Sequence, residues 1–138
     1  MLFIIISVFT FSSINNHKKN NIIAEKYINA GLNLTAKNIK KAEVLYEEII
    51  LSKNNFYSLL ALNTALEKNL FTDSNKVLKF FEIVEKLDNS SEQQDLIIFK
   101  KALYLIKIGN KEEGNKLLRV IIKKNSKLKT LAENIISE

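Results

Sequence analysis

The chain has 138 residues, enough for one domain, and 46% of them are hydrophobic, enough to form a helical core. Proline is absent and glycine occurs only three times, which argues against turn-rich sandwiches and barrels. The lack of cysteine excludes disulfides, thiolate catalysis and cysteine-based metal sites. The net charge of +6 reflects an excess of Lys and Arg between residues 100 and 129. We interpret this excess as solvated helix surface in preference to a surface for nucleic acid or lipid.

The chain begins with an apolar segment, Met1–Ile14, that carries no charged residue, and a polar stretch follows at 15–21. As a helix the segment would cover about 21 Å, against about 30 Å for the core of a bilayer. Three interpretations are open: an anchor whose beginning lies upstream of Met1, an atypical signal peptide, or a buried helix of the domain. The abrupt change in polarity favours the anchor. We therefore predict a membrane anchor at 1–14, a linker at 15–21 and a helical domain at 22–138.

Apolar residues recur at steps of three and four along most of the remaining chain, which predicts amphipathic helices. Four such residues line one face of the first helix: Ile23, Tyr27, Ala30 and Leu34. Breaks rich in Asn, Asp and Ser separate the helices, and Ser91 with Gln94 fits a capping box at the start of the fifth. The predicted helices occupy 21–37, 38 to a break at 54–55, 56–70, 74–87, 91–108, 111–124 and a short segment after Ser126.

A pattern of two small residues and one large residue recurs along these helices. The second small residue follows the first by twelve positions, and the large residue follows four later, which is the spacing of tetratricopeptide hairpins. The nine repeat positions are Ala30, Ala42 and Tyr46; Ala65, Val77 and Phe81; and Ala102, Gly114 and Leu118. The copies are offset by 35 residues (30 to 65) and 37 residues (65 to 102), near the expected period of about 34.

This spacing predicts an all-α, tetratricopeptide-like solenoid of about three hairpins plus a C-terminal helix, preceded by the apolar N-terminal helix. Small residues are needed where two helices approach closely, and the large residue fills the space beside them. Val77 is bulkier than the pattern asks, no copy has the early aromatic residue, and none ends in proline. An ordinary helical bundle in which the alanines coincide is the alternative.

The chain resembles the ancillary SecYEG translocon subunit family and, more broadly, tetratricopeptide-like domains of bacterial envelope proteins. The resemblance rests on the apolar start, the polar stretch after it, and three segments: AEKYINAGLNLTAKNIKKAEVLYEEI, FYSLLALNTALEKN and IFKKALYLIKIGNKEEGNKLLRVI. It implies a single N-terminal membrane helix in the bacterial inner membrane and a periplasmic repeat domain. It also implies protein partners, namely the translocon, other envelope proteins and chaperones.

No combination of residues predicts catalysis, a metal site or a cofactor. His17 is the only histidine and falls in the predicted linker, so neither a zinc site nor a Ser–His–Asp triad can be assembled around it. The pairs Glu47-Glu48 and Glu112-Glu113 are adjacent on helices and do not share a face, which indicates solvated surface. We therefore expect the chain not to be an enzyme.

Binding is the function that remains. In solenoids of this type the first helix of each hairpin lines a concave groove that holds a peptide or a partner helix. When the groove-lining positions of such first helices are assigned to this chain, seven residues are predicted to line the groove: Tyr27, Leu34, Leu62, Leu66, Phe99, Leu103 and Ile106. For the leucines among them, packing between repeats is the alternative role.

We accordingly predict a membrane-anchored protein-interaction module of the bacterial envelope. Two alternatives are a basic helical domain that binds nucleic acid, using the late lysines, and a secreted, soluble adaptor of the same fold.

Overall fold

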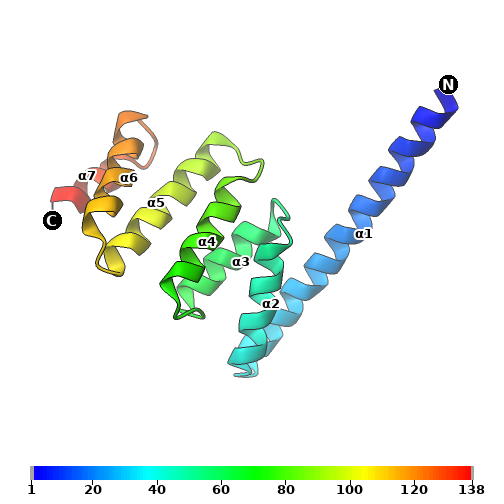
Figure 1. Cartoon of the computed structure of the whole chain (residues 1–138), viewed down its shortest axis with the longest axis horizontal. Coiled ribbons are helices and arrows are strands. Elements are labelled where there is room, and N and C mark those ends of the chain that lie inside the picture. The colour runs from blue at the N-terminus through cyan, green and yellow to red at the C-terminus, as the bar shows by residue number, and fades with distance from the viewer. Residues whose placement is uncertain (1, 138) are drawn as a thin grey trace. The chain divides into compact units, whose positions relative to one another are not determined.

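The computed structural model describes residues 2–137 of the chain, and the side chains of residues 19–137. Every regular element in this part is an α-helix, so the prediction of an all-helical chain is confirmed there (Figure 1). The helices are α1 (Leu2–Thr35), α2 (Ile39–Leu51), α3 (Tyr57–Glu67), α4 (Ser74–Glu85), α5 (Ser91–Lys107), α6 (Lys111–Lys123) and α7 (Lys129–Ser137). The predicted boundaries of α2–α6 agree with these to within three residues at each end.

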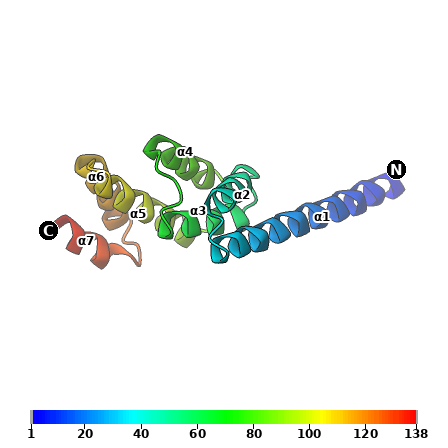
Figure 2. The same ribbon diagram turned by 90° about the horizontal axis from the view of Figure 1, so that it is seen from below.

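The chain divides into two compact units, unit 1 (Met1–Leu70) with α1–α3 and unit 2 (Phe71–Glu138) with α4–α7. In unit 1, α2 packs against both α1 and α3. Figures 1 and 2 show α2 folded back beside the C-terminal part of α1. Ala30 of α1 and Ala42 of α2 are fully buried, and Tyr46 is almost so. The two alanines allow the helix backbones to come close, and the Tyr46 ring fills the space one turn further along α2.

In unit 2, α5 packs against α4 and α6, and α6 packs against α7. Phe99, Ala102, Leu118, Ile121 and Ala132 form one buried cluster shared by α5, α6 and α7. Gly114 marks the closest approach of α5 and α6. A Cβ atom at this position would lie 2.6 Å from Cγ1 of Ile106 and 2.8 Å from the carbonyl oxygen of Ala102, so no larger residue fits without a shift.

Five helices are followed, two positions after their last residue, by a residue in the left-handed conformation. These residues are Lys37 (φ 60°), Lys53 (φ 56°), Asn69 (φ 50°), Gly109 (φ 91°) and Asn125 (φ 51°), and all but Lys53 belong to the same hydrogen-bonded motif. After α1, the N–H of Asn38 donates to the carbonyl of Asn33 at 2.8 Å, and after α5 the N–H of Asn110 donates to Leu105 at 2.9 Å. This is the Schellman arrangement, which satisfies the last carbonyls of the helix and turns the chain into the next element.

Side-chain caps start three of the helices. The side chain of Asp73 accepts from the backbone at the start of α4, and Asn110 does the same at α6. The predicted capping box of Ser91 and Gln94 is wrong by one residue, because Ser90 and Gln93 form it. Ser90 has the extended backbone (φ −61°, ψ 158°) that a cap needs, whereas Ser91 is already the first helical residue.

Helix α1 runs without a break from Leu2 to Thr35. Residues 15–21, which the sequence suggested as a linker, therefore lie within this helix. The side chains of residues 1–18 are outside the described part of the chain, and with them those of the predicted anchor, Met1–Ile14, and of His17.

Candidate partner-binding surfaces

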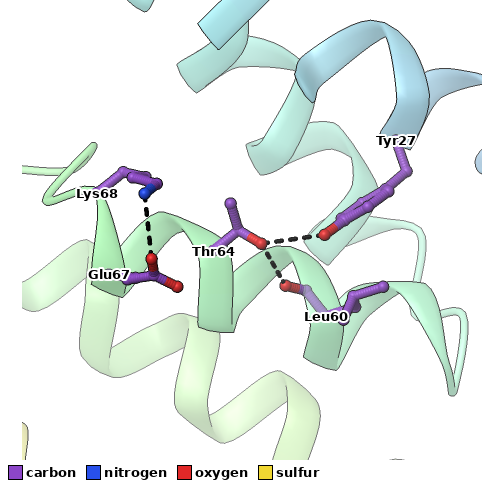
Figure 3. A network of polar contacts seen from close by, with 5 residues as sticks. All are labelled: Tyr27, Leu60, Thr64, Glu67 and Lys68. Atoms are coloured by element: carbon purple, nitrogen blue, oxygen red, sulfur yellow. Dashed lines mark hydrogen bonds and ion pairs between the residues drawn. The ribbon is translucent and has the colours of Figure 1, made fainter. Parts of the chain in front are cut away.

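Tyr27 joins the two helices of unit 1 that the groove prediction selected, α1 and α3. Its hydroxyl lies 3.0 Å from the hydroxyl of Thr64, which itself donates to the carbonyl oxygen of Leu60 at 3.1 Å (Figure 3). The Tyr27 ring also packs edge-on against Tyr46, with ring centroids 5.7 Å apart, and lies 5.9 Å from Tyr57. This mixture of aromatic packing and a hydrogen bond fixes α1 against α3, so Tyr27 has a structural role whether or not it also meets a partner.

The sequence pattern missed Thr64 as a partner of Tyr27. A signal was present, because Thr64 and Asn63 interrupt a helix that is otherwise apolar nearly all round. The polar side chain then needs a hydrogen-bond partner where α3 meets α1.

The other predicted groove residues of unit 1 are largely covered. Leu62 is 1% exposed and belongs to the core, while Leu34 and Leu66 are half-buried. A residue as deeply buried as Leu62 has almost no surface to offer a partner. Its position fits the alternative role of packing between helices.

In unit 2 the predicted groove residues divide in the same way. Phe99 is 9% exposed and part of the buried cluster, and Ile106 packs against that cluster and against Gly114. Leu103 is 38% exposed, so its side chain is the most accessible of the three.

Large apolar side chains that the groove prediction did not select are exposed on unit 1. Ile28 and Leu32 of α1 are 62% and 61% exposed. They are four residues apart and therefore neighbours on one face of the helix. Val44 and Leu51 of α2 are also exposed and share a face, seven residues apart, and Phe56 before α3 is exposed as well. The signal in the sequence was that Ile28 and Leu32 are apolar although they lie off the face of Tyr27, Ala30 and Leu34.

Unit 2 contains a concave site of its own between α6 and α7, which we call the α6–α7 groove. Its volume is about 340 Å³, and it is lined by Arg119, Ile122, Lys123, Glu133, Ile136 and Ser137. Ile122 and Ile136 pack against the buried cluster, so the apolar surface of the groove continues into the core. The charged residues stand around this apolar surface.

Ion pairs occupy several of the late basic residues. Lys101 pairs with Glu85 at 2.9 Å, Lys116 with Glu113 and Lys124 with Asp95 at 3.2 Å each, and Lys127 with Glu92. The basic excess of this region is therefore partly balanced in space by acidic residues, three of which lie outside it in sequence: Glu85, Glu92 and Asp95. Arg119 and Lys123 have no ion-pair partner among the described residues.

Two buried groups have displaced pKa values. Hydrogen bonds from Ser126 and then Lys124, together with the charge of Lys124, lower the pKa of Asp95 below its ordinary value, although burial opposes them. Burial raises the pKa of Tyr46, and the neighbouring Tyr27 adds to the effect. Asp95 is held by Ser126 and Lys124, and Tyr46 is almost fully buried, so we assign both groups to structure.

Among the described residues, no group of His, Asp or Glu side chains lies close enough to hold a metal ion. Over the same part of the chain, none of the helices is both long enough and apolar enough to span a bilayer.

Comparisons of the chain with protein-family models, with curated proteins and with solved structures gave no match.

Proposed function

We propose that the chain is a protein-interaction module built from tetratricopeptide-like hairpins and held at a membrane by its apolar N-terminal segment. The observation that carries the binding function is the exposed apolar pair Ile28 and Leu32 on α1. These two aliphatic side chains are neighbours on one helix face, so a single partner surface can cover both, whereas isolated exposed leucines are ordinary. Covering them would contribute on the order of 2–3 kcal/mol, a useful part of a binding free energy.

The burial of the repeat positions supports the hairpin part of the proposal. All nine repeat positions are buried, including Val77, although the pattern expects a smaller residue there. The turns agree as well. Lys37-Asn38 and Gly109-Asn110 have the same Schellman geometry and are 72 residues apart (37 to 109), the offset that also separates Ala30 from Ala102. A chance coincidence of alanines in an ordinary bundle would not require the turns to repeat at the same offset.

The membrane part of the proposal rests on the composition of Met1–Ile14, which is apolar and uncharged. The resemblance to the ancillary translocon subunit family suggests the bacterial inner membrane, a periplasmic helical domain, and translocon components, envelope proteins or chaperones as partners. An apolar segment shorter than a bilayer core can still hold a protein at a membrane, because apolar burial at the interface already contributes binding energy.

Crosslinking tests the binding surface. A photoreactive amino acid would replace Leu32 in the full chain, and the products formed in native membranes would be identified. The matched control replaces Asn29, which is exposed on the same helix, is polar and is directly adjacent to Ile28. We expect envelope or secretory proteins at Leu32 and a much lower yield at Asn29. Recovery of cytosolic or ribosomal proteins alone, or equal yields at both positions, would contradict the proposal.

Fractionation tests the membrane part separately. We expect the full chain in the membrane fraction after a high-salt wash, because apolar attachment resists salt whereas purely electrostatic attachment does not. A variant without residues 2–14 should move to the soluble fraction. If this variant stays with the membrane, the apolar segment is not the anchor.

A further inference from the structure

The α6–α7 groove combines an apolar surface with an uneven distribution of charge. Arg119 and Lys123 lie on α6 four residues apart, which places both cations along one wall. Glu133 and Ser137 lie on α7 with the same separation and form the other wall. Ile122 and Ile136 contribute the apolar surface between them. The groove therefore has a positive wall, an apolar centre and a wall with one negative charge.

The charges on these walls are available to a ligand. Arg119, Lys123 and Glu133 have no ion-pair partner among the described residues, although other basic residues nearby do, as Lys116, Lys124 and Lys127 show. Arg119 and Lys123 are exposed, so each retains its hydration in the absence of a partner. A carboxylate placed between them would gain two charge-assisted contacts, because no acidic residue among the described ones already pairs with either cation.

We propose that the α6–α7 groove binds an amphipathic helix of a partner protein, whose apolar stripe is bordered on one side by Asp or Glu. The apolar stripe would cover Ile122 and Ile136, and the acidic border would face Arg119 and Lys123. A groove volume of about 340 Å³ suits a few aliphatic side chains of such a helix and is small for a folded domain. Glu133 on the opposite wall disfavours a helix that is acidic on both sides, so the charge pattern also selects the orientation of the ligand.

This inference rests on the proposed role in protein binding, but it concerns a surface separate in sequence and unit from Ile28 and Leu32. If one of the two surfaces proves not to bind a partner, binding at the other can still be tested independently.

Fluorescence anisotropy with the full chain and two synthetic helices provides the test. One labelled peptide of about fourteen residues has leucines spaced by three and four and Glu along one border of the stripe; the second has Lys in place of each Glu. We expect binding of the acidic peptide and at least about tenfold weaker binding of the basic one, with an affinity for the acidic peptide that falls as salt is added.

Charge reversal at the groove sharpens the test. The double variant Arg119→Glu with Lys123→Glu should weaken binding of the acidic peptide by about tenfold or more and improve binding of the basic peptide. The matched control, Lys40→Glu with Lys41→Glu, makes the same change in net charge at exposed positions of unit 1 and should leave both affinities unchanged. Circular dichroism would establish that both double variants retain their helix content, since all four positions are exposed.

Several outcomes would overturn the inference. The first two are equal binding of the two peptides and an equal effect of the two double variants. The third is that the parent chain forms dimers in solution and the Arg119→Glu, Lys123→Glu variant does not, which would assign the groove to a second copy of this chain. Weaker binding of the Arg119→Glu, Lys123→Glu variant to anionic vesicles, together with no binding of the acidic peptide to the parent chain, would assign the groove to lipid. If the acidic peptide does not bind but Leu32 still crosslinks to envelope proteins, only the groove proposal fails.

Discussion

The hairpins α1–α2 and α5–α6 have small residues at equivalent positions but fill the space between their helices differently. In α1–α2 the pair is Ala30 and Ala42, and the large residue is Tyr46, whose hydroxyl lies 4.0 Å from where a Cβ atom of Gly31 would be. In α5–α6 the pair is Ala102 and Gly114, and the large residue is the shorter, aliphatic Leu118. The loss of one methyl group lets α6 approach α5 more closely than a Cβ atom would permit.

The difference shows what each property of the sequence controls. The spacing of the small residues decides where along the helices the contact forms, and their volume decides how close the contact is. The α1–α2 hairpin, with the aromatic Tyr46, also has polar neighbours, because Tyr27 contacts the Tyr46 ring and shares a hydrogen bond with Thr64. The aliphatic version needs no polar partner at this position.

The largest expected effect separates the two large residues. Tyr46→Ala should lower the free energy of unfolding by about 4 kcal/mol and Leu118→Ala by about 3 kcal/mol, because the aromatic ring leaves the larger cavity. Urea unfolding followed by circular dichroism measures both. Tyr46→Phe, which retains the ring, is the control and should cost less than about 1.5 kcal/mol. Equal losses for the two alanine variants would mean that both sites collapse to the same extent.

A smaller effect is expected at the glycines. Gly114→Ala should destabilise the chain by about 2 kcal/mol, because the new methyl group meets the Ala102 carbonyl at 2.8 Å. Gly31→Ala adds the same group to α1 at an ordinary contact distance, so it should stabilise by up to about 1 kcal/mol through helix propensity. Thermal unfolding of the two variants gives both values. The idea of a close approach at Gly114 would be lost if both substitutions stabilised the chain.

The ion pairs that join the elements of each unit offer a third contrast. In unit 2, Asp95 pairs with Lys124 at 3.2 Å and has little exposed surface, whereas in unit 1 Lys26 and Glu48 pair at 2.6 Å near the surface. Asp95→Ala should cost about 1.5 kcal/mol and Glu48→Ala less than about 0.5 kcal/mol.

Asp95 also predicts a dependence on pH. The folded chain lowers its pKa, so its contribution is present above the ordinary value of 3.8 and is lost as the pH falls through the lower folded value. Urea midpoints of the parent chain and of Asp95→Asn should therefore converge as the pH falls below 3.8, and a difference that stays constant through the acid range would contradict this prediction.

The last comparison concerns the two hairpin turns. Lys37 and Gly109 occupy the same left-handed position, where a side chain is strained and glycine is not. Lys37→Gly should stabilise the chain by about 0.5–1 kcal/mol, and Gly109→Ala should destabilise it by about 1 kcal/mol. The test is that the two substitutions change the stability in opposite directions, which the melting temperatures of the two variants would show. Two changes of the same sign would show that the turns are not equivalent.

Particular residues show which features of the structure could be predicted from the sequence. The helix boundaries followed from apolar periodicity and from breaks such as Asp73 and Asn110, because caps and stripes are local features. The capping box was misplaced by one residue because Ser90 and Ser91 are chemically identical, and only the backbone angles distinguish them. The candidate binding residues were harder to identify. Leu62 and Phe99 have the right register but are covered, whereas Ile28 and Leu32 are exposed.

The sequence by itself determined an all-helical chain, the order of its helices, and the small positions at which two hairpins close. These features depend on neighbours within one or two helical turns, so the local spacing of apolar, small and capping residues predicts them. Only the tertiary structure decided that Tyr27 meets Thr64, that Arg119 and Lys123 face Glu133 across a groove, and that Asp95 holds Lys124. Each of these pairings joins residues distant in sequence, and their proximity depends on how whole helices pack.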